Sequence, residues 1–217
     1  MFSLSLSLSL SRARARVCPC AHVFVFLYIG DTAGHKDTRF QITTEQHVLL
    51  MLQRQTHGRS SSSLRMQERL AYGQHQGESY ALVTGLLGKN LLELGGEGGK
   101  HAARNVLVLA AEGVSLLQEL HAANFVHRDI KPENLVLGVA GSKAARKLHL
   151  IDFGTAESLV DRNGARRTAP QAAEGSLPYM AVSVHNQNAL GKRDDVEAFV
   201  WTLLRLCLGI LPWEVSV

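Results

Sequence analysis

Residues 125–134 read FVHRDIKPEN, and residues 150–154 read LIDFG. In both stretches charged or amide side chains follow directly on short apolar runs of the kind that form buried strands. Before them, residues 101–123 carry apolar side chains at helical spacing, which predicts a long core helix, and residues 79–87, SYALVTGLL, predict a strand. A single polar residue in such a loop is usually just exposed to water, but several polar residues at these fixed spacings indicate a functional site.

The two quoted stretches resemble the catalytic loop, H-R-D-x-K-x-x-N, and the D-F-G motif of protein kinases, in the order that this family has them. The resemblance implies phosphoryl transfer, a reaction in which the protein mainly positions groups and neutralises charge. By this resemblance Asp129 accepts the proton of the substrate hydroxyl, and Lys131 stabilises the transferring phosphoryl group. Asn134 and Asp152 match the two magnesium-binding positions, and both offer the hard oxygen ligands that Mg²⁺ prefers.

Three further segments are similar to the casein kinase I group. Residues 86–91, LLGKNL, resemble the L-L-G-P-S-L hinge of that group; residues 193–197, RDDVE, resemble R-D-D-L-E; and residues 211–213 read LPW. The A-P-E motif of most other kinases is missing, as it is in that group. The resemblance covers roughly residues 43–217. It implies a protein serine/threonine kinase that transfers the γ-phosphate of ATP to protein hydroxyls, with ATP and Mg²⁺ as cofactors.

The same resemblance assigns further residues to the site. Glu45 matches the helix glutamate that pairs with the ATP-binding lysine, and Ser176 matches an activation-segment hydroxyl that steadies the catalytic aspartate and lysine. Asp195 matches a buried aspartate at the start of a central helix. The residues expected around the adenine ring are Thr84 as gatekeeper, Gly85, Leu86 and Leu87 in the hinge strand, and Val136 and Ile151 packed against the ring.

The implied fold is α+β, a protein-kinase-like two-lobe fold with an incomplete small lobe and a mainly helical large lobe. We expect residues 1–42 to be a low-complexity or atypical segment that is largely disordered. Residues 43–87 are expected to form a partial small lobe with the hinge, and residues 88–217 a truncated large lobe. Because the later helices of the family are not present, we expect apolar side chains of the helix over residues 195–208 to be exposed.

The first thirty residues have a pattern of their own. Ser alternates with Leu over residues 2–11, and Arg with Ala over residues 12–16. A period of two suits a strand with one apolar face, but translation of a repeated two-base DNA unit would give the same alternation. Residues 17–30 are largely apolar and follow three arginines, the order of a signal peptide. An uncharged run precedes the arginines, however, and no clear cleavage site follows.

Residues 1–42 also lack two features that the family carries before Glu45, a glycine-rich loop and a V-A-I-K strand. Lys36 is the only lysine there and lies closer to Glu45 than the family lysine should. Two explanations stay open: a truncated gene model of an active kinase, or a catalytically impaired, kinase-like scaffold or pseudokinase that binds a partner protein. The intact catalytic-loop and D-F-G motifs favour descent from an active enzyme.

Composition limits the remaining classes. Of the 217 residues, 46% are hydrophobic and 19% charged, which is typical of a globular domain rather than a disordered chain. No apolar run reaches the roughly 18 residues of a membrane span, so we expect no membrane partner. A formal net charge of +4 is too small to indicate nucleic acid as a partner. Three cysteines favour a reducing compartment, and we expect a cytoplasmic or nuclear protein.

Basic residues flank the expected catalytic face. They would attract protein substrates that are acidic or already phosphorylated, and the casein kinase I resemblance points the same way. The alternative is that they are solvated charges of two loops. The residues are Lys143, Arg146, Lys147, Arg162, Arg166 and Arg167.

Overall fold

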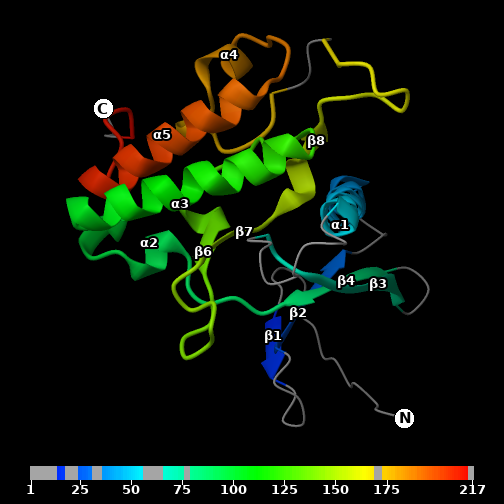
Figure 1. The fold of residues 1–217 in the computed structure, drawn as a ribbon, viewed down its shortest axis with the longest axis horizontal. Helices are drawn as coiled ribbons and strands as arrows, with labels where there is room; N and C mark the ends of the chain where they lie inside the picture. The colour runs from blue at the N-terminus through cyan, green and yellow to red at the C-terminus, as the bar shows by residue number, and fades with distance from the viewer. Residues whose placement is uncertain are drawn as a thin grey trace.

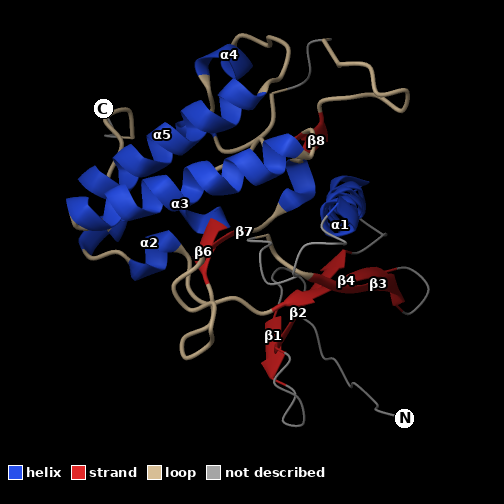
Figure 2. Cartoon of the chain, in the orientation of Figure 1, coloured by secondary structure: helices blue, strands red, loops and turns tan. Residues whose placement is uncertain are grey.

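The computed structural model describes residues 14–17, 24–30, 36–55, 66–75, 79–168 and 173–214. Figure 1 shows a two-lobe arrangement, with the sheet of β1 to β4 and helix α1 at one end and the other described helices at the other end. The elements of the small lobe are β1 (Arg14–Val17), β2 (Phe24–Gly30), α1 (Lys36–Gln55), β3 (Arg69–His75) and β4 (Ser79–Gly85). Figure 2 shows the same division by secondary structure, with the long strands confined to the small lobe. The fold is α+β, as expected.

The small-lobe sheet is antiparallel and has the strand order β1-β2-β4-β3. The prediction that residues 1–42 are largely disordered is wrong for their described part, because β2 is an interior strand that pairs with both β1 and β4. The sequence of β2, FVFLYIG, consists mostly of β-branched and aromatic residues, which fit a pleated sheet best. The Ser-Leu repeat of residues 2–11 lies outside the described residues.

Helix α1 begins at Lys36, before the boundary expected at residue 43. The added turns contain neither Gly nor Pro, so nothing in the sequence ends the helix earlier. One face of α1 is buried, with Ile42, Leu49 and Leu52 at helical spacing. This face also carries Glu45, and it packs against the 3₁₀ turn η4 (Phe153–Thr155) of the large lobe.

The large lobe surrounds two long helices that lie side by side in Figure 1, α3 and α5. The helix predicted over residues 101–123 is confirmed as α3, and the strand predicted over residues 79–87 is confirmed as β4. The elements are α2 (Leu91–Leu94), η2 (Glu97–Gly99), α3 (Ala103–Ala122), β5 (Phe125–Val126), η3 (Pro132–Asn134), β6 (Leu135–Leu137), β7 (Leu148–Leu150), η4, β8 (Glu157–Ser158), η5 (Leu177–Tyr179), α4 (Val182–His185) and α5 (Lys192–Leu208).

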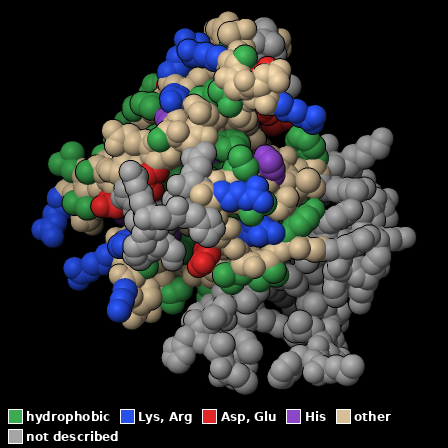
Figure 3. Space-filling view, turned by 45° about the vertical axis from the view of Figure 1, so that its right-hand side comes forward, with side chains coloured by type: hydrophobic (Ala, Val, Ile, Leu, Met, Phe, Trp, Pro, Cys, Tyr) green, Lys and Arg blue, Asp and Glu red, His purple; other side chains and the backbone are tan. Residues whose placement is uncertain are grey.

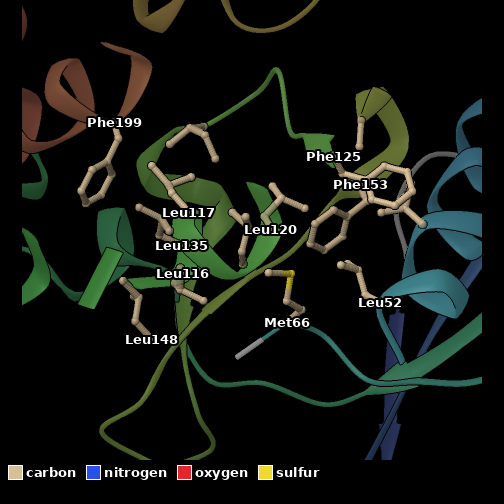
Figure 4. Close-up of a cluster of buried hydrophobic side chains, with 14 of the residues drawn as sticks. Leu52, Met66, Leu116, Leu117, Leu120, Phe125, Leu135, Leu148, Phe153 and Phe199 are labelled. Atoms are coloured by element: carbon tan, nitrogen blue, oxygen red, sulfur yellow. The ribbon is translucent and has the colours of Figure 1, made fainter. Parts of the chain in front are cut away.

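A continuous hydrophobic core joins the two lobes. Figure 4 shows Leu52 of α1 and Met66, from the small-lobe side, close to Phe153 at the start of η4. On the large-lobe side this cluster continues through Leu120 of α3 and Leu148 of β7, and all five side chains are at most 4% exposed. Fully burying one such side chain contributes roughly 1.5–3 kcal/mol, so this cluster fixes the position of α1 over the polar loops.

Helix α5 combines a buried and an exposed apolar face. Phe199 and Leu206 are buried, whereas Val196, Val200 and Leu208 are 47%, 49% and 49% exposed. The exposed side chains agree with the exposed apolar surface expected on this helix. Among the described helices, none combines the length and apolarity needed to cross a membrane.

Candidate active site

A buried carboxylate shapes the loop that follows β5. Asp195, near the start of α5, is 1% exposed. Its two oxygens accept hydrogen bonds from the backbone N–H groups of His127 and Arg128, both at 2.9 Å, and from Nε2 of His121 at 2.8 Å. These bonds hold Arg128 in the left-handed region, with φ of 73°. The loop therefore owes its shape to a residue far away in the sequence.

His127 connects this loop to the D-F-G segment. Its Nε2 lies 3.0 Å from the carbonyl oxygen of Ile151, and its Nδ1 accepts the N–H of Asp129 at 3.3 Å. These two contacts assign the proton to Nε2. The imidazole also meets the ring of Phe153 edge-on, with centroids 5.0 Å apart, and the hydroxyl of Thr155 donates to the His127 carbonyl. The two motifs are thus held as one unit.

Asp129 lies at the centre of the expected catalytic group. Lys131 Nζ donates to Asp129 Oδ2 at 2.6 Å and to Ser176 Oγ at 2.9 Å. The backbone N–H of Ser176 donates to the other carboxylate oxygen at 2.8 Å. Asn134 Nδ2 donates to the Asp129 carbonyl at 2.8 Å and to Oδ2 at 3.2 Å. The structure thus brings together Asp129, Lys131 and Ser176, the three residues to which the resemblance gives catalytic roles. Asn134, one of the two expected magnesium positions, lies beside them.

The surroundings of Asp129 favour its charged form. Burial raises the pKa of this carboxyl, but the hydrogen bond and charge of Lys131 lower it, as does the hydrogen bond of Ser176. The net result is a pKa below the ordinary value for aspartate. Asp129 is therefore a carboxylate at neutral pH, the form that can accept a proton.

A cavity of about 390 Å³ opens between the lobes beside this group. Most of the residues expected at the nucleotide line it: Glu45, Thr84, Leu86, Leu87, Asn134, Val136, Ile151 and Asp152. Gly85, at the end of β4, is not among the residues that line it. Its N–H donates to the Glu68 carbonyl at 2.9 Å and its own carbonyl faces Gln67 Nε2 at 3.4 Å, so both backbone groups turn to the neighbouring segment.

Two oxygen donors in this cavity suit a magnesium ion. Asn134 Nδ2 donates its hydrogen bonds to Asp129, so the side-chain oxygen of Asn134 can act as a metal ligand. Asp152 adopts a left-handed conformation, with φ of 64°, at the start of η4. Mg²⁺ in proteins typically takes one or two such ligands and completes its shell with phosphates and water. The described residues contain no cluster of three or more His, Cys, Asp or Glu that would hold a metal without phosphate.

Comparison with known proteins decides the family. The model of the protein kinase domain matches residues 38–216. The chain belongs to the protein kinase family. It is 36% identical over 143 residues to casein kinase 1-like protein HD16 of Oryza sativa subsp. japonica, covering 64% of this chain and 20% of that protein.

Two yeast relatives give the same grouping. Casein kinase I homolog 2 of Saccharomyces cerevisiae is 33% identical over 147 residues, covering 66% of this chain and 27% of that protein. Casein kinase I homolog 3 of Schizosaccharomyces pombe is 31% identical over 147 residues, covering 66% and 33%. The chain is therefore similar to casein kinases I, and it spans between a fifth and a third of the length of these relatives.

The kinase helix glutamate, Glu45, has an unusual environment. It is 6% exposed, and burial together with the charge of Asp152 raises its pKa to about 8, although the N–H of Phe153 opposes the shift. Lys36 does not take the place of the family lysine. It begins the same helix nine residues earlier, about 13.5 Å along the axis. The strand before that helix, β2, contains no lysine either.

Sequence reasoning did not identify Gln67 and Glu174 as residues of this site. Gln67 Nε2 donates to the hydroxyl of the gatekeeper Thr84 at 2.8 Å, and its backbone N–H donates to the Leu150 carbonyl at 3.2 Å. Glu174 forms an ion pair with Arg128 at 3.1 Å. No motif marks Gln67, which follows a stretch without pattern. Glu174 could have been noticed as the acidic residue directly before Gly175-Ser176.

Proposed function

We propose that this chain transfers the γ-phosphate of ATP to serine and threonine hydroxyls of proteins. The observation that carries the proposal is the arrangement around Asp129. Its carboxylate is ionised, and Lys131 and the N–H of Ser176 each fix one of its oxygens. A base held in this way has one orientation toward an incoming hydroxyl, which is what phosphoryl transfer requires of the protein.

Each residue then has a role that follows from its contacts. Asp129 accepts the proton of the substrate hydroxyl as that oxygen attacks. Lys131 Nζ, which lies between Asp129 and Ser176 Oγ, is placed to neutralise charge on the transferring group. Asp152 and the side-chain oxygen of Asn134 would hold Mg²⁺, which supplies charge neutralisation for the phosphates.

We place the adenine of ATP in the part of the cavity that Leu87, Val136 and Ile151 line. Backbone groups near Leu87 would hydrogen-bond its edge, while Val136 and Ile151 pack against the ring. Both side chains line the cavity, as does Leu82, which sequence reasoning did not include. Thr84 is only 3% exposed and is fixed by Gln67, so the back of the cavity has a defined shape.

We further propose that the protein substrates are acidic or already phosphorylated. Arg166, Arg167, Lys192 and Arg193 help to line a hollow of about 670 Å³ on the side of the activation segment. Lys143, Arg146 and Lys147 lie in the loop between β6 and β7, at the opposite end of the molecule in Figure 1. Arg162 follows β8 and is not among the residues that line this hollow. On the face that Figure 3 shows, the described Lys and Arg side chains lie in separate groups. This separation supports peptides rather than nucleic acid as partners.

The location in the cell is also a proposal. We place the protein in the cytoplasm or nucleus, because three cysteines in 217 residues do not suggest a disulfide framework. We also propose that it has no membrane partner. A fluorescent fusion that accumulates in the secretory pathway would contradict this placement.

Phosphate transfer tests the proposed reaction. The 217-residue chain is incubated with labelled ATP, Mg²⁺ and casein or an acidic peptide, beside its Asp129→Asn variant. We expect the variant to be slower by about 10²–10⁴-fold, because it keeps the shape of the side chain and loses the proton acceptor. A matched peptide in which each acidic residue is replaced by alanine tests the substrate preference. Equal incorporation by both proteins would overturn the assignment of Asp129 as the base.

A further inference from the structure

Phe40 is an exposed aromatic side chain beside the candidate catalytic group. It lies in the first turns of α1 and is 65% exposed. Together with Asp129 and Ser176, it lines a hollow of about 450 Å³. A single exposed phenylalanine is ordinary on a protein surface, but this one borders the space through which a substrate hydroxyl approaches Asp129. A peptide that enters this hollow therefore passes the ring of Phe40.

The packing of α1 fixes the position of Phe40. Ile42, two residues further on, is fully buried in the core that joins the lobes. Gln41 lies against Gly154 of the D-F-G segment, since a Cβ atom added to that glycine would lie 3.1 Å from Cβ of Gln41. Successive residues of an α-helix are turned by about 100°, so burial of Ile42 directs Phe40 to the opposite side of the helix. The ring is thus held at the rim of the hollow by a helix that is anchored in the core.

Three polar side chains of the hollow already have partners within the protein. Both carboxylate oxygens of Asp129 accept hydrogen bonds, the Thr155 hydroxyl donates to a backbone carbonyl, and Glu174 forms an ion pair with Arg128. The carboxylates of Asp129 and Glu174 would repel an acidic side chain next to the acceptor hydroxyl. Phe40, by contrast, offers apolar surface that a substrate can cover. The chemistry of the hollow therefore favours an apolar neighbour of the acceptor over an acidic one.

We propose that Phe40 is a specificity-determining residue, which contacts an apolar side chain next to the acceptor serine or threonine of a protein substrate. This inference rests on the proposed kinase function and deepens it by naming the substrate class. Acidic or phosphorylated groups of the same substrate would bind further away, at the basic hollow beside the activation segment. The substrate is thus a peptide with an apolar residue at the acceptor and negative charge elsewhere in its chain.

Peptide binding in the absence of ATP tests this contact, because it needs no phosphate transfer. Labelled peptides share one serine and an acidic tail, and carry either leucine or alanine directly before or directly after the serine. Fluorescence anisotropy with the full 217-residue chain measures Kd. We expect leucine at one of the two places to lower Kd about tenfold relative to alanine, since partial burial of a leucine side chain against an aromatic ring is worth about that factor. Phe40→Ala should abolish this difference, and Phe40→Leu should keep part of it.

A matched control lies on α3. Leu107 is another large apolar side chain, 73% exposed, and is not among the residues that line the hollow, so Leu107→Ala should keep the preference for leucine. A preference that persists in Phe40→Ala, or that is absent from the wild-type protein, would overturn the proposal. An equal gain in affinity for every peptide in Phe40→Ala would show that the ring only obstructs the hollow, and would overturn it as well.

Phosphate transfer to the same peptides separates this inference from the proposed function. The ratio of kcat/KM between the leucine and alanine peptides should fall about tenfold in Phe40→Ala, because the lost contact is one that selects between substrates. Leucine-dependent binding by a chain that transfers no phosphate would support the contact at Phe40 and refute the kinase function. Phosphate transfer without any preference for leucine would support the kinase function and overturn the role of Phe40.

Discussion

Replacing Gly113 by alanine should destabilise the protein, although alanine is the better helix former. Gly113 lies in the interior of α3 and is buried against α5. A Cβ atom at this position would lie 2.1 Å from Cζ of Phe199 and within 2.9 Å of both Cε atoms of the ring. Phe199 is only 3% exposed, so the ring has little room to move. The glycine therefore sets the distance between the two central helices.

The magnitude follows from two opposing effects. Alanine in a helix interior is favoured over glycine by about 1 kcal/mol, while overpacking of a tight core costs about 1–3 kcal/mol. Because the overlap is severe, we expect a net loss of about 2 kcal/mol in the free energy of unfolding for Gly113→Ala. Phe199→Leu removes the three ring atoms that collide and should cost roughly 1 kcal/mol alone. In that background, Gly113→Ala should stabilise the protein by about 1 kcal/mol.

Urea unfolding followed by tryptophan fluorescence measures the effect. Trp201 of α5 meets Trp213 edge-on, with ring centroids 5.1 Å apart, so the signal reports on this helix. The four proteins of the double-mutant cycle should show a coupling of about 3 kcal/mol between the two positions. Additive effects of the two substitutions, or an unchanged stability of Gly113→Ala, would refute the packing argument.

Three more predictions concern the loop and its supports. Asp195→Ala should lower the free energy of unfolding in urea by about 3–5 kcal/mol, because the buried His121 ring and two backbone N–H groups lose their hydrogen-bond acceptor. A loss below about 1 kcal/mol would contradict the structural role of Asp195. Gly175→Ala should abolish phosphate transfer with little loss of far-UV circular dichroism, since its Cβ would collide with the Arg128 carbonyl; full activity would show that the close approach is dispensable. Burial and nearby carboxylates raise the pKa of Tyr179 to about 12. The unfolded chain therefore ionises first, so wild-type stability should fall relative to Tyr179→Phe as pH rises from about 10 to 12; parallel pH profiles would contradict the shift.

The sequence predicts those parts of the site whose residues are neighbours in the chain. Asp129, Lys131 and Asn134 fall within one short loop, where chain connectivity limits how far apart they can lie. The long helix before them is equally local, because the apolar spacing over residues 101–123 is a property of one segment.

Contacts between distant segments could not be derived in this way. The segment that forms β2 was expected to be disordered. The sequence did not indicate this strand because its main pairing partner, β4, lies more than fifty residues further along the chain. The backbone groups of Gly85 contact Glu68 and Gln67, and the sequence did not indicate this contact because the position of Gln67 depends on packing against the large lobe.

The sequence by itself determined the family, the α+β class and the chemical groups around Asp129, because these depend on residue types and short spacings. Only the tertiary structure decided that Lys36 shares a helix with Glu45, that Asp195 shapes the catalytic loop and that Glu174 meets Arg128. The physical reason is the same in each case. Such contacts form when helices and strands pack into one core, and the packing energy is summed over many residues that are far apart in the sequence.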